Sequence, residues 1–140
     1  MLLGVLAAAM LLACSRSDPE QALRATITAM AQAVEQHRVS DAIEPLADDF
    51  TRESGAFGKQ DARRMLAAAM LRNEKIQLIA TVSDVRIVGE RATAKIHVIA
   101  TGGAGLLPER GQTWDFDTAW RRDGSRWKLY NAEWREGAGP

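Results

Sequence analysis

Apolar residues recur at helical spacing in the first part of the chain. In segment 19–36 they follow one another at intervals of four, three and four residues, which places on one helix face Leu23, Ile27, Met30 and Val34. Asp18 and Pro19 are typical of a helix start, as the N-cap and the first helical residue, and Gln21 fits a capping box. The pattern predicts a helix from Pro19 to about Gln36.

Two further helical segments follow before residue 76. Ser40 is a suitable cap for a short second helix that carries Ala42 and Ile43, and Pro45 limits its length because proline lacks the N–H that a helix interior needs. A third helix is predicted over residues 59–72, where one face carries Met65, Leu66, Ala69 and Met70.

From residue 76 the hydrophobic period changes to two, which is typical of strands. The dipeptides Gly89-Glu90 and Asp123-Gly124 indicate tight turns, and a glycine-rich stretch near residue 103 indicates a longer loop. Four strands are therefore predicted, within segments 76–87, 92–100, 114–121 and 127–134. Three helices followed by a four-stranded antiparallel meander predict an α+β fold.

The alternation also predicts which side chains face the helices. In the third strand one face carries Trp114, Phe116, Thr118 and Trp120. In the last strand Trp127 and Leu129 set the inward phase. That phase continues through Asn131 and Glu133 and leaves Trp134 outward, on a surface available to a partner.

Composition excludes several classes of protein. The 140 residues fit one domain, and 46% of them are hydrophobic, which excludes a disordered chain. Lys plus Arg and Asp plus Glu both number 18, so the charge balance gives no indication of a nucleic-acid partner. The single Cys excludes an internal disulfide, and His37 and His97 lie too far apart in sequence to suggest a metal site. No cofactor is predicted.

The N-terminus has the pattern of an export signal. Residues 1–13 are uncharged and apolar, and 13 residues are fewer than the ~18 that a membrane-spanning helix needs. The segment ends at Cys14, and residues 15–18 are polar. The alternative is a soluble protein in which this segment is a buried helix and Cys14 is an ordinary cysteine.

Residues 11–14 (LLAC) resemble a bacterial lipobox. The resemblance implies removal of the signal peptide 1–13, a diacylglyceryl thioether on Cys14 and an acyl group on its new amine, followed by a short tether over residues 14–18. Two or more acyl chains suffice for stable anchoring. Ser15 resembles the residue that follows the cysteine in lipoproteins sent to the outer membrane, which implies a domain that faces the periplasm.

Three segments of the remaining chain resemble the nuclear-transport-factor-2-like superfamily, which includes ketosteroid isomerases and polyketide cyclases. They are residues 46–50 (LADDF), taken as the close of a helical pair, 89–94 (GERATA) and 120–129 (WRRDGSRWKL). The resemblance spans about residues 19–136. It implies a cone-shaped α+β fold in which a curved sheet wraps around the first helix and leaves a conical pocket. Many such domains form homodimers through the outer face of the sheet.

The resemblance also bears on catalysis. Isomerase-like members use a carboxylate base together with a Tyr and a protonated Asp that stabilise an oxyanion. Matching their pattern to this chain places Met30 at the Tyr position, Ser54 at the base and Thr118 at the oxyanion Asp, with Asp117 one residue away. Met cannot donate a hydrogen bond and Ser is not a base. Glu133 and Asp117 remain as candidate acids or bases.

The inward residues suggest a ligand pocket instead. Its predicted wall consists of Met30, Trp114, Phe116, Thr118, Trp120 and Asn131. The alternative is that the aromatic rings form the core. We therefore expect a lipid-anchored, non-enzymatic envelope domain that binds an apolar small molecule or a protein partner. An isomerase- or cyclase-like enzyme with a divergent active site, and a structural adaptor of an envelope complex, are the alternatives.

Overall fold

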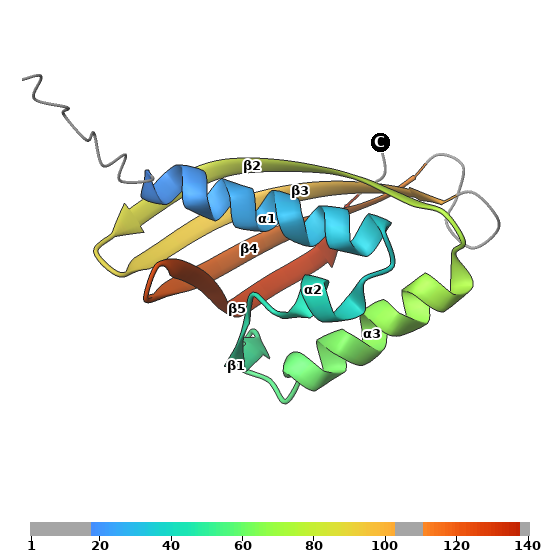
Figure 1. Ribbon diagram of the computed structural model, residues 1–140, viewed down its shortest axis with the longest axis horizontal. Helices are drawn as coiled ribbons and strands as arrows, with labels where there is room; N and C mark the ends of the chain where they lie inside the picture. The colour runs from blue at the N-terminus through green and yellow to red at the C-terminus, as the bar shows by residue number, and fades with distance from the viewer. Residues whose placement is uncertain (1–17, 103–110, 138–140) are drawn as a thin grey trace, which may run out of the picture.

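A curved sheet covered on one face by helices forms the domain (Figure 1). The computed structural model describes residues 18–102 and 111–137, and in these residues it has three helices and five strands. The helices are α1 (Pro19–Glu35), α2 (Val39–Ile43) and α3 (Lys59–Arg72). The strands are β1 (Leu46–Arg52), β2 (Ile76–Val88), β3 (Arg91–Gly102), β4 (Gln112–Asp123) and β5 (Arg126–Glu136). None of the described helices combines the length and apolar character needed to cross a bilayer.

The strand order is β1-β5-β4-β3-β2, and the chain folds as the α+β class that its sequence predicts. Strands β2 to β5 form the predicted antiparallel meander. The fifth strand, β1, pairs in parallel with β5, although residues 46–50 were expected to be helical. Pro45 interrupts the helix, and its carbonyl accepts a hydrogen bond from Leu129 N at 2.9 Å, which begins the parallel pairing.

The helices agree with the sequence predictions more closely than β1 does. Asp18 caps α1, since its carboxylate accepts a hydrogen bond from Glu20 N at 3.0 Å. Helix α3 has the predicted bounds. Helix α2 begins at Val39 with Arg38 in the N-cap position, so the expectation that Ser40 caps this helix is wrong.

A bulge in β5 changes which side chains face the helices. Ala119 pairs with Asn131 and Trp120 pairs with Leu129, which leaves Tyr130 as an extra residue. One extra residue reverses the alternation beyond it. The predictions that Asn131 and Glu133 continue the inward phase and that Trp134 faces outward are therefore wrong. Trp134 instead packs against the hydrophobic core.

The core lies between α1 and the sheet and contains two of the four tryptophans. Trp120 and Trp127 are 1% and 2% exposed, and they pack with Leu23 and Ile43. The indole of Trp127 donates a hydrogen bond to Pro19 O at 3.0 Å, so β5 is attached to the first residue of α1. At this end of the sheet, where α1 begins, the space between helix and sheet is filled by side chains.

Candidate functional site

Half-buried aromatic rings lie on the helix-facing side of the sheet, beyond the core. We define the aromatic cluster as Phe57, Phe116 and Trp134. The ring centroids of Phe57 and Trp134 are 5.4 Å apart at 76°, and those of Phe116 and Trp134 are 5.9 Å apart. Trp114 lies two residues before Phe116, is also half-buried and shares its face of β4. The cluster joins the β4–β5 hairpin to the segment before α3, which lies far from that hairpin in the chain.

Five of the six predicted ligand-binding residues divide into two groups. Met30 packs against the core but is only partly buried, like Trp114 and Phe116. Thr118 and Trp120 are buried and bonded to their surroundings. The indole of Trp120 donates to Thr118 Oγ1 at 2.8 Å, and the Thr118 hydroxyl donates to Ala94 O at 2.7 Å. These two residues belong to the core, which leaves the half-buried group as the surface that a ligand can reach.

Asn131, the remaining predicted ligand-binding residue, holds the end of β1. Its amide donates to Thr51 O at 3.1 Å and also to Thr51 Oγ1 and Glu53 O. Glu53 has a φ of 55°, in the left-handed region, and its N–H donates to Ala132 O at 3.1 Å. Asn131 therefore stabilises the unfavourable backbone conformation with which the chain leaves β1.

The candidate acids and bases do not approach the aromatic cluster. Asp117 and Glu133 lie opposite each other in the register of β4 and β5, on the outer face of the sheet. Lys95 Nζ lies 3.9 Å from the Asp117 carboxylate on the same face. Both acids line an open hollow of about 550 Å³ on that face. Ser54, which the resemblance places at the base position, lies in an exposed turn after β1.

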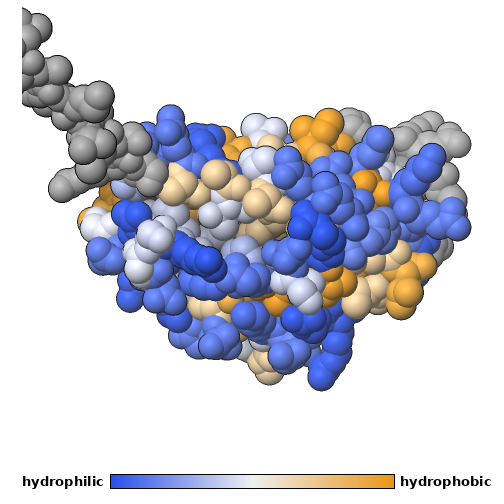
Figure 2. Space-filling model, viewed as in Figure 1, coloured by the Kyte–Doolittle hydropathy of each residue, from blue (hydrophilic) through white to orange (hydrophobic). Residues whose placement is uncertain are grey.

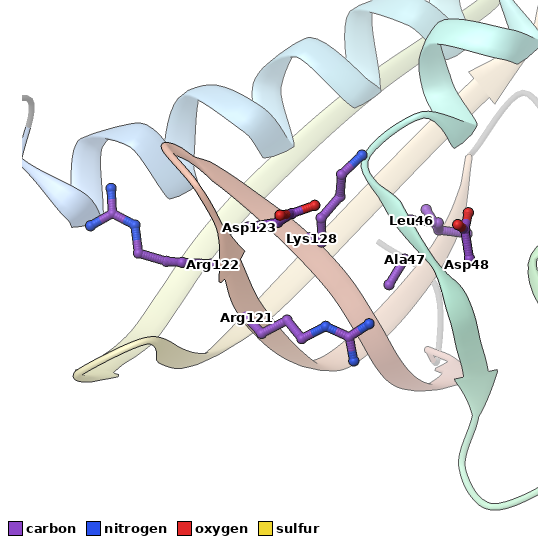
Figure 3. A pocket seen from close by; sticks show the side chains of 7 residues that line it. All are labelled: Leu46, Ala47, Asp48, Arg121, Arg122, Asp123 and Lys128. Carbon is purple, nitrogen blue, oxygen red and sulfur yellow. The ribbon is translucent and has the colours of Figure 1, made fainter.

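A second open hollow, of about 440 Å³, lies between β1 and the β4–β5 hairpin (Figure 3). Lys128 on its wall donates to the Glu44 carbonyl at 2.8 Å and to the Glu44 carboxylate at 3.0 Å. Arg121 binds the Asp49 carboxylate through both terminal nitrogens. The hydrogen bond from Arg121 is the largest cause that lowers the pKa of Asp49 below its usual value. These basic groups are therefore already paired with acids of the same chain.

Arg52, which the sequence did not single out, places a charged group against the aromatic cluster. Its guanidinium carbon lies 4.1 Å from the centroid of Trp134, in a cation–π contact. One terminal nitrogen donates to Trp134 O at 2.9 Å, whereas the buried Nε has no hydrogen-bond partner within the described structure. Recognising β1 as a strand would have revealed this residue, because Arg52 and the buried Phe50 then share one face.

Several solved structures resemble the fold of this chain over most of its length. A candidate scytalone dehydratase from Novosphingobium aromaticivorans superposes with a TM-score of 0.75 at 12% identity, over 86% of this chain and 85% of its own. A candidate dehydratase of the nuclear-transport-factor-2-like family from Streptomyces avermitilis gives 0.69 at 18% identity, over 85% and 97% of the chains. The fold is nuclear-transport-factor-2-like.

A third similar structure has no established activity. It is a nuclear-transport-factor-2-like protein of unknown function from Pseudomonas putida, with a TM-score of 0.62 at 19% identity over 82% of this chain and 84% of its own. No protein-family model and no curated protein matches the sequence. Likeness at these identities establishes the fold, and a nuclear-transport-factor-2-like fold accommodates both ligand-binding and isomerase-like roles.

Proposed function

We propose that this chain is a lipid-anchored domain of the cell envelope that binds an apolar small molecule on the helix-facing side of its sheet. The observation that carries the binding proposal is the incomplete burial of Trp114 and Phe116, beside a core that already buries Trp120 and Trp127. Large aromatic side chains contribute most to stability when buried. Rings left partly exposed next to such a core are suited to contact a ligand.

The anchor proposal rests on the sequence around Cys14, which lies outside the described residues. Cys14 precedes the start of α1 at Pro19 by five positions. Since an extended chain spans at most ~3.6 Å per residue, lipidation of Cys14 would hold the start of α1 within roughly 20 Å of the membrane. Ser15 favours the outer membrane, with the domain in the periplasm.

A protein partner, including a second copy of this chain, is the second candidate occupant. Ile79 on β2 is 63% exposed, and Val88 at the end of the same strand is 79% exposed. Ile79 pairs with Ile99 on β3, so two apolar side chains lie together on the outer face of the sheet. This surface favours an adaptor or a homodimer. By contrast, Figure 2 shows a mostly hydrophilic surface on the side where the helices lie.

Native mass spectrometry of the chain extracted from bacterial membranes tests the binding proposal. We expect a co-purified adduct with the mass of a small apolar molecule. The double variant Trp114→Ala, Phe116→Ala should lose this adduct, because it removes the two partly exposed rings. The matched control Ile79→Ala alters an apolar side chain on the opposite face and should retain it.

A protein without an adduct, from wild type and control alike, would contradict small-molecule binding. A mass of twice the chain without an adduct would favour the homodimer, and a heavier complex would favour an envelope protein as partner. Equal adducts on the wild type and on the double variant would show that the molecule binds elsewhere.

A further inference from the structure

Arg52 places a positive charge beside an aromatic surface. Its side chain is half-buried, so the charge is neither fully solvated nor sealed in the core. The guanidinium stacks on Trp134, and one terminal nitrogen satisfies the Trp134 carbonyl. The buried Nε has no acceptor. A guanidinium carries five N–H donors, and leaving buried donors unsatisfied is costly.

Within residues 18–102 and 111–137, no carboxylate lies within 4.0 Å of the Arg52 guanidinium. Some other arginines are paired with a carboxylate: Arg121 binds Asp49, and Arg126 binds Glu44. Burial of a charged group without a partner is costly. Arg52 therefore has the capacity to accept an acidic group from outside the described chain.

The backbone on both sides of Arg52 is fixed before any ligand arrives. Arg52 N donates to Phe57 O at 3.0 Å, and the next residue, Glu53, donates to Ala132 O. Asn131 binds the carbonyls of Thr51 and Glu53, on either side of Arg52. A charged group held in this way loses less conformational freedom on binding, which favours affinity.

We propose that Arg52 binds the carboxylate of an apolar acid whose hydrocarbon or aromatic part lies against Phe116 and Trp114. This inference rests on the proposed function, since it names the chemical class of the ligand at the same surface. A carboxylate accepts hydrogen bonds from two nitrogens of one guanidinium, which gives a stronger and more directional contact than a neutral hydroxyl gives. The aromatic rings supply contact area for the apolar part.

Equilibrium dialysis with a pair of probes tests the proposal. The full chain is reconstituted in lipid nanodiscs, empty nanodiscs serve as the blank, and the probes are 1-naphthoate and 1-naphthylmethanol. The two share a ring system and differ in charge. We expect 1-naphthoate to bind at least about tenfold more tightly, the ratio that one charge-assisted hydrogen bond can supply. Arg52→Met should lower its affinity to that of the alcohol and leave the alcohol unaffected.

Arg122→Met is the matched control. Arg122 also lies over a tryptophan, at 5.2 Å from the ring of Trp127, and its Nε is also buried without a partner in the described structure. It lies on the β4–β5 hairpin, and in Figure 3 its side chain points away from Arg121 and Lys128. The preference for 1-naphthoate should survive this change. If Arg52→Met does not fold, Arg52→Lys keeps the charge but not the two-nitrogen contact, and should reduce the preference without abolishing it.

The outcomes separate this inference from the proposed function. Equal affinity of the wild type for both probes would overturn the role of Arg52 and leave apolar binding standing. Binding of neither probe would overturn both. If Arg122→Met also lost the preference for 1-naphthoate, that preference would come from the overall charge of the domain. This result would overturn the assignment to Arg52.

Discussion

Glu44 joins the end of α2 to β5 through its ionised carboxylate. It follows α2, and its carboxylate binds Lys128 Nζ at 3.0 Å and Arg126 at 3.1 Å on β5. These contacts lower the pKa of Glu44 below its ordinary value of 4.5, with the hydrogen bond from Lys128 as the largest cause and burial acting in the opposite direction. Ionisation of one residue thus helps to hold the corner before β1 against the last hairpin.

The pH dependence follows from the sign of this shift. Because the pKa is lower in the folded chain, the contact stabilises the fold above the unfolded pKa and is lost as the pH falls through the folded pKa. Lys128→Met should raise the pKa of Glu44 toward 4.5, as followed by NMR titration of its carboxyl carbon. The cost at neutral pH should be at most about 1 kcal/mol, because Glu44 is half-exposed.

Lys95→Met is the control for this titration. Lys95 contacts Asp117 on the outer face, at 3.9 Å, and does not touch Glu44. The pKa of Glu44 should be the same in this variant as in the wild type. A Glu44 titration that Lys128→Met leaves unaltered would disprove the contact.

Among the elements, β5 connects three others: it pairs with β1 and β4 and is hydrogen-bonded to α1. It lies between β1 and β4, it carries the buried Trp127, and it reaches α1 through the hydrogen bond from Trp127 to Pro19. The bulge at Tyr130 then brings Trp134 to the helix-facing side. Strand β5 therefore contributes Trp127 to the core before its bulge and Trp134 to the aromatic cluster after it.

Removal of the Trp127 ring should destabilise the domain strongly. Trp127→Ala should lower the free energy of unfolding by ~3–5 kcal/mol, since it leaves a cavity and removes the bond to α1. Trp127→Phe keeps most of the buried area and should cost less. Chemical denaturation monitored by circular dichroism measures both. Trp114→Ala, at a half-buried position of the neighbouring strand, is the control with the smaller loss, and a Trp127→Ala loss no larger than this would show that Trp127 is not a core residue.

The sequence predicted some elements and not others, for physical reasons. Helices α1 and α3 arise from local spacing and, for α1, from a local cap, so a single window of sequence contains the information. Strand β1 has adjacent exposed acids, Asp48 and Asp49, which break a period of two. Its partner, β5, lies about 80 residues further along the chain. Such a strand is specified by pairing with a distant segment, which no local pattern reveals.

At the scale of the whole molecule, the two faces of the sheet have different roles. The helices cover one face, which holds the core and the aromatic cluster, while the outer face carries the pairs Asp117–Lys95 and His97–Asp115. The first residue of α1 lies beside the buried Trp127. An anchor at Cys14 would therefore attach to the end of the domain opposite the half-buried aromatic rings.

Cys14→Ser tests the anchor. We expect the wild-type chain to sediment with outer membranes and to accumulate as an unprocessed precursor under globomycin, whereas Cys14→Ser should lose its acyl chains because serine cannot form the thioether. Ser15→Asp is the informative control, since it should keep lipidation and redirect the chain to the inner membrane. Processing of the wild type that globomycin does not affect would contradict lipidation and favour an ordinary cysteine at this position.

The sequence by itself determined the order of the helices and of the four meander strands, and with them the fold class, because periodicity and turn residues act over short stretches of chain. Only the tertiary structure decided the pairing of β1 with β5, the phase of Asn131, Glu133 and Trp134 after the bulge, and the position of Arg52 over the Trp134 ring. These features depend on contacts between segments about 80 residues apart. An insertion of one residue in a strand reverses every side chain beyond it, and only the partner strand reveals where that insertion lies.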